Sequence, residues 1–193
     1  KETSLSKMKN LALNLNKKAD EYGMENVLIM IDIGPDLGSI NDNLDDYHPW
    51  IDCANEMKCH SVRVNLRGSD DDLSLWTENS IKNLNKLCEY AKPLNVNILV
   101  ENHGGFSSNA DYLVNVIKKI NYDNIGTLPD FGNFCIKHDP KKSTEMRKLF
   151  TQGSEESSGR PPTIYDSCAE RFDMYDGIKK LMKYAKGVSA KTH

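Results

Sequence analysis

A carboxylate and an imidazole stand two residues apart where an apolar run meets two glycines, in residues 97–105 (NILVENHGG). Apolar residues bounded by glycine predict a buried strand, and polar groups at its carboxyl end are typical of a ligand site in a parallel α/β sheet. Because alternate side chains share one face of a strand, Glu101 and His103 fall on the same side, about 7 Å apart. We interpret this stretch as the floor of an active site, with a solvated strand end as the alternative.

Other apolar runs also end in polar residues that could bind a ligand. Arg63 and Asn65 share a face near the end of residues 60–66, and Asp130 closes residues 125–130. An arginine can bind phosphate or carboxylate oxygens, although an ion pair with a neighbouring acid such as Glu101 is the alternative. The carboxyl ends of parallel strands meet at one edge of a sheet, so we expect these side chains to gather there.

An alternation of strands and helices must position these residues. The spacing of apolar residues predicts helices over about residues 3–22, 49–57, 77–91, 109–120 and 175–185. Between them we expect adjacent parallel strands over residues 27–32, 61–66, 98–102, 126–130 and 188–191. Low hydrophobicity and a Pro161-Pro162 pair predict an insertion or mobile loop at about 139–165, with weak order between residues 141 and 162. The pattern indicates a parallel α/β fold.

The composition limits the class of protein. The 193 residues, of which 38% are hydrophobic and 27% charged, provide enough material for one core. No apolar run approaches the roughly 20 residues that span a bilayer, nothing at the start resembles a signal peptide, and a net charge of −3 offers no basic surface for nucleic acid. The chain opens without a methionine, so processing or truncation could have removed a leading segment.

The cysteines are odd in number and irregularly spaced, which argues against a disulfide framework and a CxxC metal site and favours a reducing, cytoplasmic compartment. They are Cys53, Cys59, Cys88, Cys135 and Cys168.

Five motifs occur in the order, and at the strand ends, seen in sugar phosphate isomerase/epimerase proteins. They are VLIMID (27–32), CHSVRVN (59–65), VENHGG (100–105), PDFGNF (129–134) and VSAKTH (188–193). Over about residues 24–193, the insertion aside, the chain therefore resembles the xylose-isomerase-like TIM-barrel group. The resemblance implies one partial (β/α)₈ barrel domain over residues 1–193 with strands three to seven present, because such barrels usually need about 250 residues. A complete α/β fold of another topology is the alternative.

The resemblance also implies a metal site. In such proteins a Glu, an Asp, a His and a second Glu on strands five to eight hold a divalent ion, and by motif Glu101 and Asp130 match the first two ligands. Ser189 falls at the usual position of the His, two residues before Lys191, and His193 lies on the same face of the predicted strand. We therefore expect His193 to be the imidazole ligand, with a site that has no histidine as the alternative. Carboxylates and an imidazole suit Mn²⁺ above all, and also Mg²⁺, Co²⁺ or Zn²⁺.

Further roles follow from the same motifs. Glu101 is expected to be the catalytic base as well as a ligand. Asn133 stands where relatives commonly carry a histidine, so it can bind a hydroxyl group but cannot carry a proton. His103 could instead cap the glycine turn that follows it, and Asp32 is expected to hold the loop 34–38. The residues expected to bind substrate are Arg63, Asn65, His103, Asn133 and Lys191.

Three functions remain open at this point. The first is a metal-dependent isomerase or epimerase of a sugar or sugar phosphate, which acts by carboxylate-mediated proton transfer through an enediolate. The second is a lyase of the inosose-dehydratase type on the same barrel, and the third is a non-catalytic carbohydrate-binding relative. A zinc phosphodiesterase of the DNA-repair type shares the fold but needs a histidine cluster and a basic surface, which this sequence lacks. The expected partner is a small sugar or polyol, and the state of assembly stays open, a homo-oligomer included.

Overall fold

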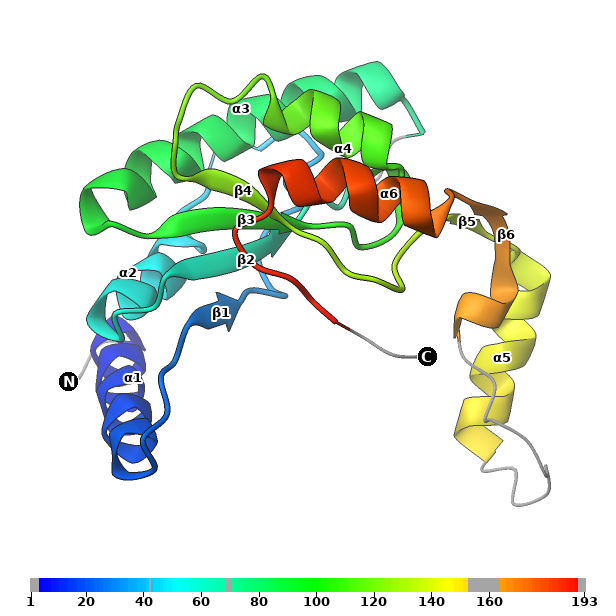
Figure 1. The fold of residues 1–193 in the computed structure, drawn as a ribbon. Helices are drawn as coiled ribbons and strands as arrows, with labels where there is room; N and C mark the ends of the chain where they lie inside the picture. Colours follow the sequence, from blue (N-terminus) through cyan, green and yellow to red (C-terminus); the bar gives the residue numbers. More distant parts are fainter. Residues whose placement is uncertain (1–3, 42, 69–70, 153–163, 191–193) are drawn as a thin grey trace.

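Parallel strands form the centre of the computed structural model, which describes residues 4–41, 43–68, 71–152 and 164–190. The sheet has the order β1-β2-β3-β4, with β1 at Leu28–Met30, β2 at Ser61–Asn65, β3 at Asn97–Glu101 and β4 at Ile125–Leu128. Each neighbouring pair is parallel, so the four carboxyl ends meet at one edge of the sheet (Figure 1). The predicted arrangement of these four strands is confirmed.

Helices alternate with the strands, and several of them cover one face of the sheet. They are α1 (Ser4–Glu21), α2 (His48–Glu56), α3 (Leu73–Ala91), α4 (Ala110–Ile117), α5 (Pro140–Gln152) and α6 (Met174–Leu181). The 3-10 turns η1 (Lys92–Leu94), η2 (Gly105–Ser108), η3 (Ile164–Ser167) and η4 (Met182–Tyr184) complete the described elements. In Figure 1, α3, α4 and α6 lie together over the sheet, and α1 lies beyond α2 on the β1 side. Such alternation of strand and helix is the arrangement that parallel pairing requires.

Side-chain caps fix where several helices begin. Asp72 accepts hydrogen bonds from the backbone N–H groups of Ser74 and Leu75, at 2.8 and 3.0 Å, so α3 begins four residues before its predicted start. Asn109 caps α4 in the same way. An oxygen at this position satisfies N–H groups that have no partner inside the helix.

The two faces of the central strands differ in character. Val62, Val64, Ile98 and Val100 are fully buried and belong to the hydrophobic core together with side chains of the covering helices. The alternate positions of the same strands carry Leu99 and several polar side chains, among them Arg63, Asn65 and Glu101, which therefore lie on the opposite face. The sheet thus separates an apolar layer under the helices from a polar inner face.

Residues 185–190 continue the parallel alignment beside β4, but only as isolated bridges. Thr127 pairs with Ala185 and Asp130 pairs with Ser189, both in the parallel sense. The Ser189 backbone N–H donates to Pro129 O at 2.8 Å, and the Phe131 N–H donates to Ser189 O at 3.2 Å. The predicted strand at 188–191 therefore lies next to β4 in its described part, while Lys191 falls outside the described residues.

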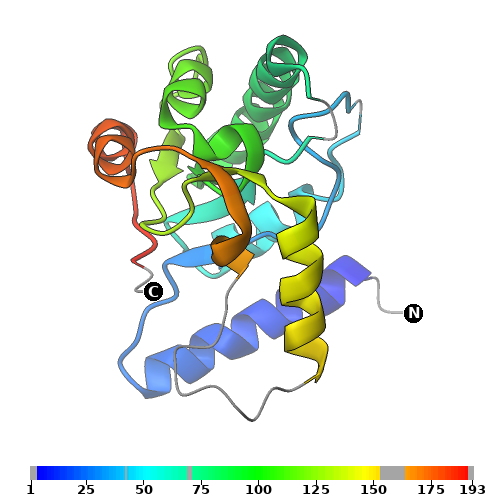
Figure 2. The same ribbon diagram turned by 90° about the vertical axis from the view of Figure 1, so that its right-hand side faces the viewer.

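The predicted insertion or mobile loop at 139–165 contains a helix in its first part, so a loop is wrong there, whereas the insertion stays a prediction. β5 (Cys135–His138) pairs in the antiparallel sense with β6 (Cys168–Arg171), and α5 extends from β5 away from the sheet (Figures 1 and 2). The Asp139 carboxylate accepts from the N–H groups of residues 141 and 142 at 2.8 and 3.1 Å, and Pro140 opens the helix. An N-cap followed by proline is a strong start signal that outweighs low hydrophobicity. Residues 153–163 lie outside the described residues, and the prediction of weak order there stays a prediction.

A disulfide joins Cys135 to Cys168, so the expectation that the cysteines stay unpaired is wrong for these two. They lie 33 residues apart in the sequence and meet because β5 and β6 pair, which irregular spacing could not reveal. Cys53, Cys59 and Cys88 are free and buried.

None of the described helices is both long enough and apolar enough to cross a membrane.

Candidate functional site

The acids predicted to form the site lie at the carboxyl edge of the sheet and are completely buried. Glu101 is the last residue of β3, stands opposite Asn65 of β2 in the strand register and has 0% exposure. Asp130 follows the end of β4 by two residues and also has 0% exposure. A carboxylate is rarely buried to this extent unless other groups pair with it. The structure therefore places both acids where a solvated strand end cannot explain them.

Glu101 forms an ion pair with Arg63, which was one of the two predicted roles of that arginine. Arg63 Nε lies 2.9 Å from Glu101 Oε2, and the arginine side chain is only 5% exposed. On its other side, Arg63 Nη1 donates to Asp32 Oδ1 at 2.7 Å and to Ile31 O at 3.2 Å. The guanidinium thus bridges the ends of β1 and β3 and compensates the charge of the buried glutamate.

Asp32 differs from its expected role, because its side chain does not hold the loop 34–38. Its Oδ1 accepts from Arg63 and, at 3.4 Å, from Asn65 Nδ2. The hydrogen bond from Arg63 keeps the pKa of Asp32 below its usual value, and the nearby charges of Arg63, Arg67 and His103 act in the same direction. The loop is held instead by Tyr47, whose hydroxyl donates to Pro35 O at 2.7 Å and whose pKa is raised to about 12 by burial.

Asp130 is held by three hydrogen bonds from its own turn and from the next strand. Its Oδ1 accepts from the backbone N–H groups of Gly132 and Asn133 at 2.9 and 3.1 Å. Its Oδ2 accepts from Ser189 Oγ at 3.0 Å. The residue at the expected histidine position therefore contacts the second predicted ligand through a hydroxyl group. A carboxylate held in this way has a fixed orientation before any ligand binds.

Asn102 connects the two strand ends, a role that the sequence reasoning missed. Its Oδ1 accepts from the Asp130 N–H at 2.7 Å, while its Nδ2 donates to the carbonyls of Asp130 at 3.0 Å and Asn133 at 2.9 Å. The Ser108 hydroxyl donates to the same Asn133 carbonyl at 2.9 Å. The only sequence signal was an amide beside the acid of a buried strand. With these bonds the ends of β3 and β4 form one rigid unit.

Serine hydroxyls close the turn after β3. The backbone N–H groups of His103 and Gly104 donate to the hydroxyls of Ser107 and Ser108 at 3.0 and 2.8 Å. Gly104 has φ 85°, a left-handed value that favours glycine. The His103 ring is half-buried, and its charge contributes to the lowered pKa of Asp32, so it lies near the carboxyl edge.

The third predicted ligand cannot be placed, because Lys191 and His193 lie outside the described residues. Within the described ranges, no three side chains of His, Cys, Asp and Glu form a group that could hold a metal ion. The two carboxylates nevertheless have the oxygen donors that a hard divalent ion prefers. Glu101 and Asp130 thus suit two of the four metal ligands that the motifs imply. The other two, His193 and a further glutamate, remain predictions.

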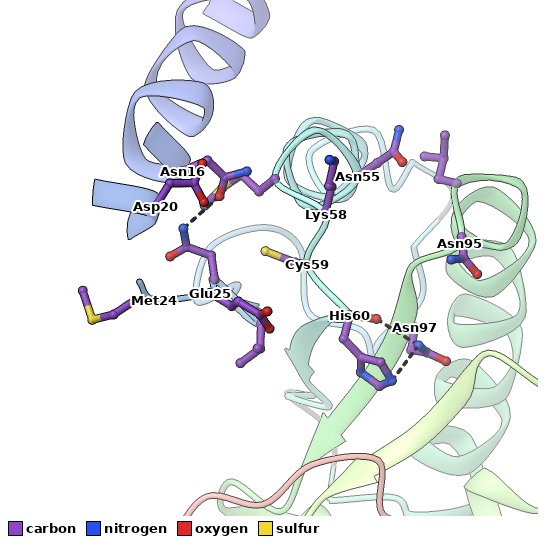
Figure 3. A pocket seen from close by; sticks show the side chains of 14 residues that line it. Asn16, Asp20, Met24, Glu25, Asn55, Lys58, Cys59, His60, Asn95 and Asn97 are labelled. Carbon is purple, nitrogen blue, oxygen red and sulfur yellow. Dashed lines mark hydrogen bonds between the residues drawn. The ribbon is translucent and has the colours of Figure 1, made fainter. Parts of the chain in front are cut away.

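A cavity of about 840 Å³ lies at the opposite, amino edge of the sheet. Its walls come from the segments that precede β1, β2 and β3, and amide side chains dominate them (Figure 3). A smaller cavity of about 20 Å³ borders Asp32, Asn65 and Arg67 at the carboxyl edge. The larger hollow is therefore separate from the buried acids.

The parallel sheet, its covering helices and the acids at its carboxyl edge define an α/β-barrel type of protein. The sequence model of the family described as xylose isomerase-like TIM barrel matches residues 4–184, so the chain belongs to that family. No curated protein matches the chain in sequence. The predicted fold class is confirmed, and the described strands make up part of such a barrel.

Solved structures of sugar epimerases share the fold. A D-tagatose 3-epimerase-like protein superimposes with a TM-score of 0.63 at 17% identity, over 94% of this chain and 61% of its own. A 3-keto-D-glucoside 4-epimerase from E. coli gives 0.61 at 11% identity, over 96% and 78%. A D-psicose 3-epimerase from Clostridium cellulolyticum H10 gives 0.58 at 13% identity, over 94% and 68%. The chain thus spans less than two thirds of the first of these proteins.

Proposed function

We propose that this chain carries the site of a metal-dependent isomerase or epimerase of a sugar or sugar phosphate, with Glu101 as the base. The observation that carries the proposal is a fully buried glutamate at the carboxyl edge of the sheet, charge-compensated by Arg63 and next in the strand order to Asp130. In α/β barrels this edge is where active sites lie. The names of the similar structures, D-tagatose, D-psicose and 3-keto-D-glucoside epimerases, support a sugar as the substrate.

The proposed chemistry is proton transfer next to a carbonyl group. Glu101 takes a proton from the carbon beside the substrate carbonyl, and the electrons of that bond form an enediolate. Return of a proton to the opposite face of the same carbon gives an epimer, whereas its return to the former carbonyl carbon gives an isomer. A carboxylate whose orientation is fixed can return the proton on the face from which it took it, whereas return to the opposite face needs a second acid, for which the second glutamate of the motif is the candidate.

Glu101 and Asp130 would hold the divalent ion, together with His193 and the second glutamate that the motif implies. When bound, the ion would supply positive charge that stabilises the enediolate oxygen. The fixed Asp130 carboxylate supports this role, because its oxygens are already oriented by Gly132, Asn133 and Ser189. Mn²⁺ is the proposed ion, and Mg²⁺, Co²⁺ and Zn²⁺ suit the same oxygen and nitrogen donors.

Polar residues around the acids would orient the hydroxyl groups of the sugar. Asn65 Oδ1 is buried, and no hydrogen-bond partner for it lies within the described part of the chain, so a substrate hydroxyl could donate to it. We propose substrate contacts for His103, Asn133 and Lys191 as well. Nη1 of Arg63 donates to Asp32 and to the Ile31 carbonyl, while Nε lies at ion-pair distance from Glu101 without forming a hydrogen bond to it, so we propose Nη2 for any contact with substrate.

Exchange of sugar protons with solvent tests the proposal. The full-length protein is incubated with Mn²⁺ in D₂O and a panel of ketoses and ketose phosphates, and deuterium incorporation is followed by NMR. Exchange without loss of water marks an isomerase or epimerase, and exchange with dehydration marks the lyase. Glu101→Gln should lower the exchange rate by about 10²-fold or more and weaken Mn²⁺ binding, because an amide neither accepts the proton nor binds the ion well.

The matched control is Glu89→Gln, which makes the same change at an exposed position of α3 and should leave both quantities unchanged. A folded, full-length protein that binds no Mn²⁺ at millimolar concentration and exchanges no sugar proton would contradict the proposal. The non-catalytic carbohydrate-binding function would then take its place.

A further inference from the structure

The guanidinium of Arg63 is fixed from two sides by acids that come from different strands. Nε meets Glu101 Oε2 at 2.9 Å, and Nη1 meets Asp32 Oδ1 at 2.7 Å. Nη1 forms a hydrogen bond, whereas the Nε contact with Oε2 is an ion pair without hydrogen-bond alignment, and both contacts belong to one rigid, planar guanidinium. Any movement of the outer edge therefore changes the position of the inner edge, which contacts Glu101.

The exposure of the three side chains falls in steps from the surface to the base. The Asp32 side chain is 60% exposed, that of Arg63 is 5% exposed and that of Glu101 is 0% exposed. An ion pair at the surface usually contributes little to stability, whereas an ion pair in the interior depends strongly on its geometry. Asp32 is thus the only one of the three that solvent reaches freely, and it is anchored at the end of β1.

The backbone around Asp32 holds that end of the network in place. The Ile31 N–H donates to Arg63 O at 2.9 Å, and Ile31 O accepts from Arg63 Nη1 at 3.2 Å. Asp32 Oδ1 also accepts from Asn65 Nδ2 at 3.4 Å. Loss of the Asp32 charge would weaken the hydrogen bond from Nη1, for which the Ile31 carbonyl is the other described acceptor, and the guanidinium could then turn.

We infer that Asp32 is a positioning residue, which holds Arg63 so that Arg63 holds the Glu101 carboxylate in one orientation. The effect on turnover rests on the proposed function of Glu101, whereas the coupling between the three side chains does not. The role resembles that of the outer residues around a metal site, which fix the groups that touch the ion or the substrate. Asp32 itself touches neither.

Kinetics of the full-length protein give the first test. Asp32→Asn should lower kcat for sugar proton exchange by about ten- to a hundred-fold, the usual effect of losing such an outer residue, with KM for the sugar unchanged. Asp32→Glu, which keeps the carboxylate, should recover part of the rate. The matched control is Asp36→Asn, which removes the same charge from the exposed loop after β1 and should leave kcat unchanged.

A double-mutant cycle in urea unfolding tests the same inference without any activity. Positioning predicts that Glu101→Gln costs less stability once Asp32→Asn is present, by a factor of roughly two or more in the unfolding equilibrium constant. Simple repulsion between two carboxylates predicts the opposite sign. The coupling should vanish in the Arg63→Met background, and Arg63→Lys serves the same purpose if that variant does not fold, because lysine cannot bridge two acids with fixed donors.

The outcomes separate the two proposals. If the wild-type protein showed no exchange activity, the proposed function would be refuted. The positioning role of Asp32 would then be judged from the sign of the coupling energy in the double-mutant cycle. An Asp32→Asn variant that matches Asp36→Asn in kcat, with no coupling or a repulsive coupling to Glu101, would overturn the positioning role.

Discussion

Replacing Gly177 with alanine should displace backbone that holds the candidate site, although Gly177 belongs to α6, one of the helices that cover the sheet. A Cβ atom at this position of α6 would lie 2.2 Å from Cε1 and 2.8 Å from Cδ1 of Phe134. The Phe134 ring is 1% exposed and has no free space to enter. Phe134 directly follows Asn133, whose carbonyl accepts from Asn102 and Ser108 at 2.9 Å each. A displaced ring would therefore move the backbone that joins the two strand ends.

The size of the effect follows from two opposing terms. Forcing extra volume into a packed core typically costs about 1–3 kcal/mol, and contacts as short as these favour the upper half of that range. Alanine in a helix interior recovers about 0.5–1 kcal/mol relative to glycine. The free energy of unfolding of Gly177→Ala should thus fall by roughly 1–2 kcal/mol, measured by urea denaturation with circular dichroism. The rate of sugar proton exchange should fall with it, because Asn133 shifts.

Two further variants identify the cause. Phe134→Leu should destabilise the wild type but recover part of the loss in the Gly177→Ala background, since the smaller side chain makes room for the methyl group. Lys179→Ala, at an exposed position of the same helix, should leave stability nearly unchanged. If Gly177→Ala unfolded at the same urea concentration as the wild type or at a higher one, the packing of α6 on Phe134 and its link to the site would be refuted.

Three other predictions concern Asp32, the disulfide and Asn133. The folded pKa of Asp32 is lowered, so its ion pair should stabilise the fold above about pH 4 and lose this effect as the pH falls through the folded pKa. The difference in unfolding free energy from Asp32→Asn, below about 1 kcal/mol because the side chain is largely exposed, should therefore shrink as the pH falls below about 4, and a difference that did not change with falling pH would contradict the ion pair. The Cys135→Ser/Cys168→Ser variant should lose up to about 3–4 kcal/mol of stability for a separation of 33 residues, whereas dithiothreitol should lower the urea midpoint of the wild type only. Asn133→Ala should raise KM for the sugar and spare Mn²⁺ affinity, which titration calorimetry would show, and an equal loss of both would argue against a substrate contact.

The strands and most helices could be predicted because their signals are local. The apolar residues of β2 and β3 and the helical spacing of α1, α2, α4 and α6 lie within short windows of the chain, and the structure confirms them. α5 was missed because its low hydrophobicity outweighed the Asp139-Pro140 start signal in the prediction. The pairing of β5 with β6 was missed because its partners are separated by the whole insertion. Long-range antiparallel pairing of short strands leaves almost no trace in a local window.

The candidate site could be predicted in its residues but only partly in its contacts. Glu101 and Asp130 were placed at the carboxyl edge because strand ends and side-chain alternation are regular. The choice between a substrate contact and an ion pair for Arg63 needed the distance to Glu101, and Asp32 was assigned to the wrong partner. Asn102 was passed over because its hydrogen bonds go to the backbone of another strand. Such contacts depend on the packing of segments that lie far apart in sequence.

The register of the strands determines the core and the site together. In β2 and β3 the valines and isoleucine face the helices while Arg63 and Glu101 take the alternate positions, so a shift by one residue would exchange the two sets. Such a shift would place charged side chains among the apolar side chains under the helices, where burying charge is costly, and valines on the polar face. The ion pair that compensates Glu101 therefore also discriminates against the wrong register. The same register buries the apolar side chains and brings Arg63 next to Glu101. A variant that lacks Arg63 should therefore weaken the alignment of the strands as well as the orientation of the base.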